Sequence, residues 1–255
     1  EQYNYAVGSQ GAREPGSTFK LASMIALLED SDIELTDTVD TGNGAMKFFN
    51  ETMRDHKPGG YGVLTVQEVF EKSSNIGTAK LITKQFGAKP SRYTDYIKQI
   101  GLDKPLGFQM VGEGVPYIKD PTDSTWSGIS LPWISHGYEL KMTPLQTLTL
   151  YNAVANNGKM IQPLIVKSVK KANRSMETYK AKVLNDKICS KETLRQVKIM
   201  LEGVVERGTA QNIKNDKYKI AGKTGTAKKV VNGRYTSNYY NLILKLLRKI
   251  FSIRL

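Results

Sequence analysis

A serine and a lysine stand three positions apart in the segment EPGSTFK, at Ser17 and Lys20. A serine hydroxyl is a weak nucleophile until a neighbouring base takes its proton. Residues three apart on a helix share one face, so the Lys20 amine is expected to reach the Ser17 hydroxyl. The amine acts as a base only if burial and a nearby cation lower its pKa. At a helix start, the Ser17 N–H would also be free to bind an oxyanion.

A second motif, Ser73-Ser74-Asn75, follows in the segment KSSNIG. The Ser73 hydroxyl could relay a proton between Lys20 and a leaving amine. The Asn75 amide carries both a donor and an acceptor, which suits the clamping of a substrate amide. The same residues could instead do no more than cap the helix that follows. This motif therefore indicates a function only in combination with the other two motifs.

The third motif is the segment AGKTGTA, which holds Lys223, Thr224, Gly225 and Thr226. A cation and two hydroxyls along one predicted strand suit the recognition of a substrate carboxylate. Gly225 removes a side chain, so a peptide could lie against the strand as an added β-partner. The Thr226 N–H is expected to be the second oxyanion donor. The alternative is a basic strand edge that runs into a turn.

The order of the three motifs is more specific than any one of them. An S-x-x-K spacing arises by chance, and it recurs at Ser168 to Lys171, where we interpret Ser168 as a solvated strand-end residue. The ordered set of S-x-x-K, S-x-N and K-T-G is that of the penicillin-interactive serine enzymes. The set predicts nucleophilic chemistry at Ser17.

The elements that must position these residues are mostly helical. Apolar periodicity and cap residues predict helices at 17–29, from 65 onward, at 76–86 and 91–100, from 144 to about 155, and at 191–205. Strands are expected at 161–169 and, in two stretches, at 217–231. Residues 31–62 and 101–137 are rich in turn formers, and the second segment is expected to be a long surface excursion.

Composition narrows the classes of function. The 255 residues are 40% hydrophobic, which excludes a disordered, collagen-like or coiled-coil chain. A single cysteine, Cys189, and two histidines, His56 and His136, give neither an internal disulfide nor a metal-ligand spacing. The net charge of +13 permits nucleic acid or anionic membranes as partners without choosing between them. No apolar run of 18 residues or more is present to span a membrane.

Beyond the motifs, the segments EPGSTFKLAS, KSSNIGTAKL and GYELKMTPLQ resemble class B penicillin-binding proteins over about residues 1–237. WSGISLPW and SHGYE are most similar to division-specific septal transpeptidases of the Bacteroidetes type. The resemblance implies an α+β fold of the penicillin-binding, β-lactamase-like kind, mainly its helical lobe with an incomplete antiparallel sheet. It implies a transpeptidase domain at 1–240 and a basic apolar tail, interpreted as aberrant, at 241–255.

The resemblance also implies a reaction, in which Ser17 attacks the D-Ala-D-Ala carbonyl of a peptidoglycan stem peptide. The acyl group then passes to the amine of a neighbouring stem, and β-lactams acylate the same serine. The implied catalytic residues are Ser17, Lys20 and Ser73, and the implied substrate-binding residues are Asn75, Lys223, Thr224, Gly225 and Thr226. No metal or organic cofactor is implied. Implied partners are cell-wall synthesis or divisome membrane proteins, not nucleic acid, with the catalytic domain on the periplasmic side of the cytoplasmic membrane.

The two ends depart from the family pattern, so a piece of a longer protein is expected. Only 16 residues precede Ser17, where two strands are usual. After Thr236 the sequence looks like a basic amphipathic helix, either a membrane-surface helix or, preferably, a frameshift product. The K-T-G strand would then lack sheet partners, and the chain is expected to be poorly active alone.

Two other functions are kept open. A serine β-lactamase shares S-T-F-K and K-T-G, although the stretch between Asn75 and Thr224 is long for that group. A non-enzymatic basic module for membrane or nucleic acid is the second alternative, although the Lys and Arg residues are scattered without a nucleic-acid motif.

Overall fold

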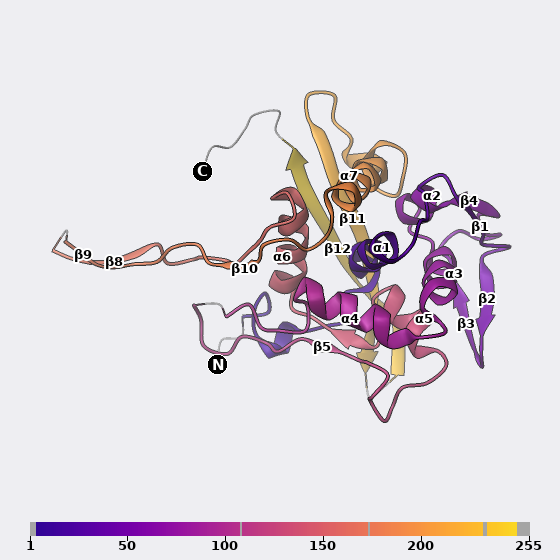
Figure 1. The fold of residues 1–255 in the computed structure, drawn as a ribbon, viewed down its shortest axis with the longest axis horizontal. Coiled ribbons are helices and arrows are strands. Elements are labelled where there is room, and N and C mark those ends of the chain that lie inside the picture. Colours follow the sequence, from indigo (N-terminus) through magenta and orange to yellow (C-terminus); the bar gives the residue numbers. More distant parts are fainter. Residues whose placement is uncertain (1–3, 108, 173, 232–233, 249–255) are drawn as a thin grey trace.

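The computed structural model consists of a helical body with an extended arm on one side (Figure 1). Its backbone is described for residues 4–107, 109–172, 174–231 and 234–248, and its side chains as far as Gly225. Within that part the architecture is α+β, with helices around a central helix and every strand in an antiparallel pair. This confirms the predicted fold class.

The helices follow the predicted positions closely. Their bounds are α1 Lys20–Asp30, α2 Val66–Glu71, α3 Asn75–Phe86, α4 Pro90–Ile100, α5 Ser130–Ser135, α6 Pro144–Ala155 and α7 Lys191–Glu206, with 3₁₀ turns η1 Ser9–Gly11, η2 Gly16–Phe19 and η3 Gln211–Ile213. The capping box of Thr65 and Glu68 starts α2, and Thr143 caps α6 with Gln146 in the same way. The caps explain why these starts could be predicted from the sequence.

The strands form two-stranded pairs. Their bounds are β1 Thr38–Asp40 with β4 Val63–Thr65, β2 Ala45–Phe48 with β3 Glu51–Arg54, β5 Tyr117–Ile118 with β6 Leu140–Lys141, β7 Met160–Ile161 with β10 Val183–Asn185, β8 Ser168–Lys171 with β9 Arg174–Thr178, and β11 Lys219–Val231 with β12 Arg234–Arg248. The β8–β9 hairpin is the outer part of the arm in Figure 1.

Four predicted elements differ from the structure. The two stretches expected at 217–231 form one continuous strand, β11. The helix expected at 17–29 opens as the 3₁₀ turn η2, and the α-helix begins only at Lys20. The strand expected at 161–169 is broken into β7 and the start of β8, because Pro163 interrupts it. The excursion expected at 101–137 contains α5, whose Leu131 and Ile134 are buried in the core.

The C-terminal segment also differs from its prediction. Residues 241–248 belong to β12, which pairs with β11 from Lys219–Arg248 to Val231–Arg234. The helical interpretation was therefore wrong for these residues, and 249–255 lie outside the described part. A short apolar run does not distinguish helix from strand by itself, and here an open strand edge is available as a partner. The K-T-G strand is thus paired along one edge, contrary to the expectation.

The core is built around α1, whose residues from Lys20 to Leu28 are all buried. Helices α3, α4 and α7 pack on α1, and β11 passes close to η2 and α7. A second, smaller cluster of Phe48, Met53, Ile76 and Ala79 fastens the β2–β3 hairpin to α3. The result places η2, the start of α3 and β11 around the buried end of α1.

Candidate active site

Ser17 lies in η2, immediately before α1, and is 6% exposed. The turn is fixed by a close approach of two glycines. The Gly16 N–H donates to the Gly137 carbonyl at 3.0 Å, and a Cβ on Gly137 would lie 2.0 Å from the Gly16 carbonyl oxygen. On the other side, the Tyr151 hydroxyl donates to the Thr18 carbonyl at 2.8 Å. The backbone around Ser17 is therefore held from two directions.

Lys20 is the first residue of α1 and is completely buried. Its amine lies 2.7 Å from the Ser73 carbonyl oxygen, 2.7 Å from Asn75 Oδ1 and 3.3 Å from Ser73 Oγ. Burial lowers the pKa of Lys20 well below its usual value, and the nearby charge of Lys223 lowers it further. Both causes are those expected from the sequence. A neutral amine at this position has a lone pair with which to take a proton.

The Ser73 hydroxyl lies between two amines. Lys223 Nζ donates to Ser73 Oγ at 2.7 Å, while Lys20 Nζ is 3.3 Å from the same oxygen. The backbone of Ser73 has φ of +58°, a left-handed conformation that is uncommon outside glycine. This arrangement gives one hydroxyl a route for a proton in either direction.

Lys223 lies in β11 and is 1% exposed. Burial lowers its pKa to about 7. Its amine is 5.6 Å from the centre of the Phe70 ring and donates to the Thr224 carbonyl at 3.0 Å. The Thr224 hydroxyl is 2.6 Å from that of Thr209, which follows α7. The K-T-G strand is thereby fixed to both the second motif and α7.

The structure thus brings Lys20, Ser73, Asn75 and Lys223 into one hydrogen-bonded cluster, with Ser17 one turn before Lys20. Among the described residues no hydrogen bond joins the Ser17 hydroxyl to the Lys20 amine, because Ser73 and Asn75 hold that amine. Catalytic hydrogen bonds often tighten only when substrate is bound.

The other two residues of the third motif lie in β11. Gly225 is buried, and the backbone of Thr226 pairs with Asn241 of β12. The Thr226 side chain lies outside the described part. The expected roles of Gly225 in accommodating a peptide and of the Thr226 N–H in binding an oxyanion stay predictions.

Asp55 is one site residue that sequence reasoning missed. It follows β3, and its carboxylate accepts hydrogen bonds from the Asn75 N–H at 2.6 Å and the Ser74 hydroxyl at 2.8 Å. Its charge acts on Lys20 in the opposite sense to Lys223 and raises the pKa of that amine. No spacing rule signals Asp55, because only the docking of the β2–β3 hairpin brings it to α3.

His136 is the other missed residue, although it lies within the SHGYE segment. Its ring packs against Trp133 and Tyr138, with ring centres 5.9 and 4.9 Å away. Neither ring nitrogen has a hydrogen-bond partner among the described residues. Burial, followed by the nearby charge of Lys20, lowers the pKa of His136 to about 3. The imidazole is therefore neutral at physiological pH.

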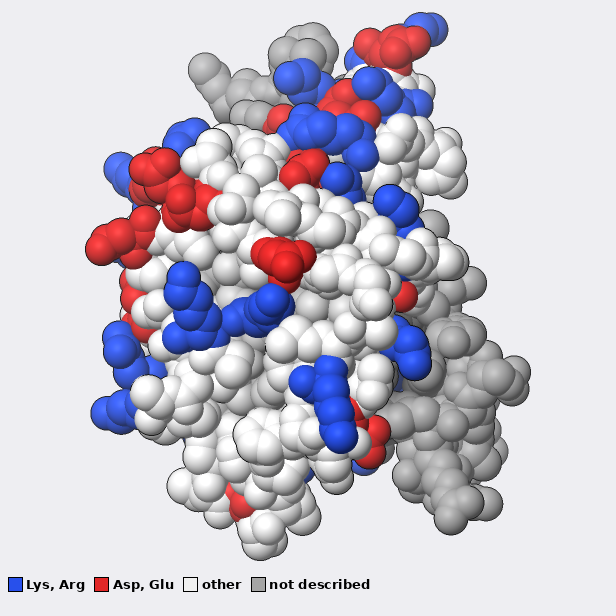
Figure 2. Space-filling model, turned by 90° about the vertical axis from the view of Figure 1, so that its right-hand side faces the viewer, with Lys and Arg blue, Asp and Glu red and all other residues white. Residues whose placement is uncertain are grey.

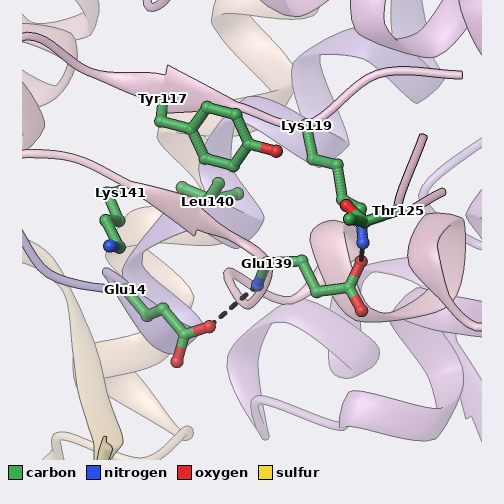
Figure 3. A pocket seen from close by; sticks show the side chains of 7 residues that line it. All are labelled: Glu14, Tyr117, Lys119, Thr125, Glu139, Leu140 and Lys141. Carbon is green, nitrogen blue, oxygen red and sulfur yellow. Dashed lines mark hydrogen bonds and ion pairs between the residues drawn. The ribbon is translucent and has the colours of Figure 1, made fainter. Parts of the chain in front are cut away.

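A small cavity of about 210 Å³ lies beside β5 and β6 (Figure 3). Two acidic side chains face it, and they are tied to the cavity wall. Glu14 Oε1 accepts from the Glu139 N–H at 2.9 Å, and the Glu139 carboxylate pairs with Lys119 at 2.8 Å. Glu14 precedes Ser17 by three positions, so its bond to Glu139 fastens the segment that leads into η2.

The surface charge is dispersed on the face drawn in Figure 2, where blue Lys and Arg side chains alternate with red acidic ones. Within the described residues, no cluster of His, Cys, Asp and Glu is suited to a metal ion. Of the helices described, none has the length and apolarity to cross a bilayer.

The family profile described as the penicillin-binding protein transpeptidase domain matches residues 2–245. The chain belongs to this family. It is 30% identical over 237 residues to stage V sporulation protein D of Bacillus subtilis, covering 92% of this chain and 36% of the relative. It is 31% identical over 227 residues to penicillin-binding protein PbpB of Mycobacterium tuberculosis, covering 86% and 32%. The chain spans about a third of the length of these curated relatives.

Solved structures of transpeptidases have the same fold. Penicillin-binding protein 3 of Mycobacterium tuberculosis, complexed with ampicillin, superposes with a TM-score of 0.84 at 29% identity, covering 97% of this chain and 55% of that one. The transpeptidase domain of penicillin-binding protein 3 from Burkholderia pseudomallei gives 0.80 at 27% identity, covering 95% and 68%. The predicted family and fold are confirmed, while the Bacteroidetes-type affinity stays a prediction.

Proposed function

We propose that this chain is the catalytic part of a peptidoglycan D,D-transpeptidase that works through an acyl-enzyme on Ser17. The observation that carries the proposal is the buried cluster of Lys20, Ser73 and Lys223 beside a serine held in a rigid turn, in a chain of this family. The pKa of both amines is lowered, so a proton can move within the cluster near neutral pH.

In the first half-reaction the Ser17 oxygen bonds to the D-Ala-D-Ala carbonyl carbon while its proton passes to the Lys20 amine. The N–H groups of Ser17 and Thr226 are the proposed donors to the oxyanion. When the C–N bond breaks, the departing D-alanine amine takes the proton back by way of Ser73. The product is an ester on Ser17.

In the second half-reaction the amine of a neighbouring stem peptide attacks this ester. Its surplus proton returns through Ser73 and Lys20 to the Ser17 oxygen, which restores the free hydroxyl. The crosslink is the new amide bond. Residues Asn75, Lys223, Thr224 and Gly225 are assigned to holding the donor peptide, with the Lys223 ammonium facing its terminal carboxylate. No step in this scheme needs a metal or an organic cofactor.

The setting is proposed from the relatives. Their names refer to sporulation, to a peptidoglycan D,D-transpeptidase FtsI homolog, and to complexes with ampicillin and aztreonam. We assign the chain to septal cell-wall synthesis on the periplasmic side of the cytoplasmic membrane, with divisome membrane proteins as partners. The Lys and Arg residues are scattered along the sequence without a nucleic-acid motif, which does not favour a nucleic-acid partner.

Labelling with a fluorescent penicillin tests the proposal. We expect one label per chain in the wild type and none in Ser17→Ala. The matched control is Ser168→Ala, since Ser168 has the same S-x-x-K spacing and should label like the wild type. Equal labelling of Ser17→Ala and the wild type would contradict the proposal. The rate also tests the expectation that this chain is poorly active alone.

Nitrocefin separates the transpeptidase from the β-lactamase alternative. A transpeptidase traps the opened lactam as an ester, so we expect one burst equal to the amount of protein. Sustained turnover that is lost in Ser17→Ala would assign the chain to the β-lactamases instead.

A further inference from the structure

The β2–β3 hairpin delivers one carboxylate to the start of α3. The hairpin is fastened to α3 by Phe48 and Met53, which pack on Ile76. Its second strand ends at Arg54, whose carbonyl accepts from the Asn75 side-chain amide at 2.9 Å. Asp55 follows directly, and its own N–H donates to the Gly44 carbonyl at 3.0 Å. The hairpin thus presents two acceptors to the start of α3, the Arg54 carbonyl and the Asp55 carboxylate.

The carboxylate completes the hydrogen bonding at the start of α3. A helix leaves its first N–H groups without intrahelical partners. Here Asp55 Oδ1 accepts from Asn75 at 2.6 Å and from Ile76 at 3.1 Å, and the Ser74 hydroxyl accepts from Gly77 at 2.9 Å. That hydroxyl donates in turn to Asp55 Oδ2 at 2.8 Å. A negative charge at this end of a helix is also favourable.

These bonds act on the one strained residue of the motif. Ser73, at φ +58°, precedes the capped turn and must hold its hydroxyl between Lys20 and Lys223. A non-glycine residue keeps such a conformation only when its surroundings enforce it. On its C-terminal side, the enforcing contacts are those of Ser74 and Asn75 with Asp55.

The charge of Asp55 faces the same cluster. It acts on the Lys20 amine of α1 and on the Tyr61 hydroxyl before β4, and the charge of Lys223 on β11 acts on that same amine. The neutral His136 after α5 is near enough to be affected by the charge of Lys20. Two buried amines would repel each other if both were protonated, and Asp55 favours one ammonium in the cluster.

We propose that Asp55 is a positioning residue of this active site, which holds Ser73 and Asn75 on the Lys20 amine and offsets the effect of the Lys223 charge on that amine. It touches no reacting atom and acts through the second motif. The inference rests on the proposed function for its kinetic effect, while its structural effect can be measured without any reaction.

Two substitutions separate the hydrogen-bonding role of Asp55 from the role of its charge. Asp55→Asn keeps an oxygen to accept from the helix N–H groups and an amide to donate to Ser74, but it removes the charge. Because that charge raises the pKa of Lys20, the acid limb of the pH profile of penicillin acylation should move to lower pH, by about half a unit or more. Asp55→Ala removes both roles, and its acylation should slow by on the order of 100-fold. The matched control is Glu51→Gln, which removes an exposed charge from β3 of the same hairpin.

Amide hydrogen exchange gives the second readout. In Asp55→Ala the amides of Asn75 and Ile76 should exchange about 10-fold faster or more than in the wild type, while those in α7 stay unchanged. If the wild type takes no label, the proposed function fails and the exchange at these two amides still decides the positioning role. If Asp55→Ala does not fold, the position of the acid limb in Asp55→Asn tests the inference instead. Acylation within about twofold of the wild type, an unmoved acid limb and unchanged exchange would overturn the inference.

Discussion

Replacing His136 by phenylalanine tests whether one buried imidazole makes this fold sensitive to acid. The ring lies between Trp133 and Tyr138, and its nitrogens bond to no described group. Phenylalanine keeps an aromatic ring there and removes the two polar atoms that burial leaves without partners. At pH 7.5, where histidine is neutral both folded and unfolded, we expect the variant to be at least as stable as the wild type.

The magnitude follows from the two pKa values of His136. The unfolded chain binds a proton at the ordinary pKa of 6.5, while the folded protein resists it down to about 3. Between these values the unfolded state holds more protons, so the free energy of unfolding falls as the pH falls, by about 1.4 kcal/mol per unit. At pH 5 the expected contribution is about 2 kcal/mol of lost stability, which His136→Phe should regain.

Urea unfolding at a series of pH values between 7.5 and 4.5 measures this difference. The wild type, measured at the same pH values, is the control. If His136→Phe lost stability with acid as steeply as the wild type, the imidazole would not be the acid-sensitive group. The argument from its burial would then be refuted.

Two further predictions concern the turn that contains Ser17 and the strand β11. Gly137→Ala should destabilise the protein by about 2–4 kcal/mol in urea unfolding and abolish labelling, because its Cβ would meet the Gly16 carbonyl at 2.0 Å. Gly101→Ala has a similar positive φ but open space, so it isolates the backbone cost, and an equal effect of the two would refute the steric argument. The pKa of Lys223 is about 7, so affinity for carboxylate-bearing β-lactams should weaken as the pH rises through 7. Lys223→Arg stays charged and should lack this step in binding titrations, and a step that persists in it would assign the titration to another group.

Local signals explain what the sequence could predict. Caps such as Thr65 and Thr143 and the apolar periodicity of α7 are properties of neighbouring residues, so those helices were expected where they occur. The residue types of the three motifs indicated the site for the same reason. The sequence also indicated why the Lys20 pKa should fall, since burial and a second lysine are the two largest causes in the structure.

The missed features depend on contacts between distant segments. Asp55 reaches α3 only because a separate apolar cluster docks its hairpin. The segment at 241–248 has a helical pattern in isolation, and the available edge of β11 makes it a strand. The left-handed turn at Ser73 brings the carbonyl and hydroxyl of this residue to the Lys20 amine, which helical spacing alone could not show.

The bond between Lys223 and Ser73 joins residues 150 positions apart in the chain. Contacts of such long sequence separation form slowly, because a large loop must close before they stabilise anything. During synthesis the cluster of Lys20, Ser73 and Lys223 therefore stays unassembled until the ribosome has released the K-T-G segment. Labelling by a β-lactam that reacts only with the assembled cluster would then report the time at which the last stage of folding is complete.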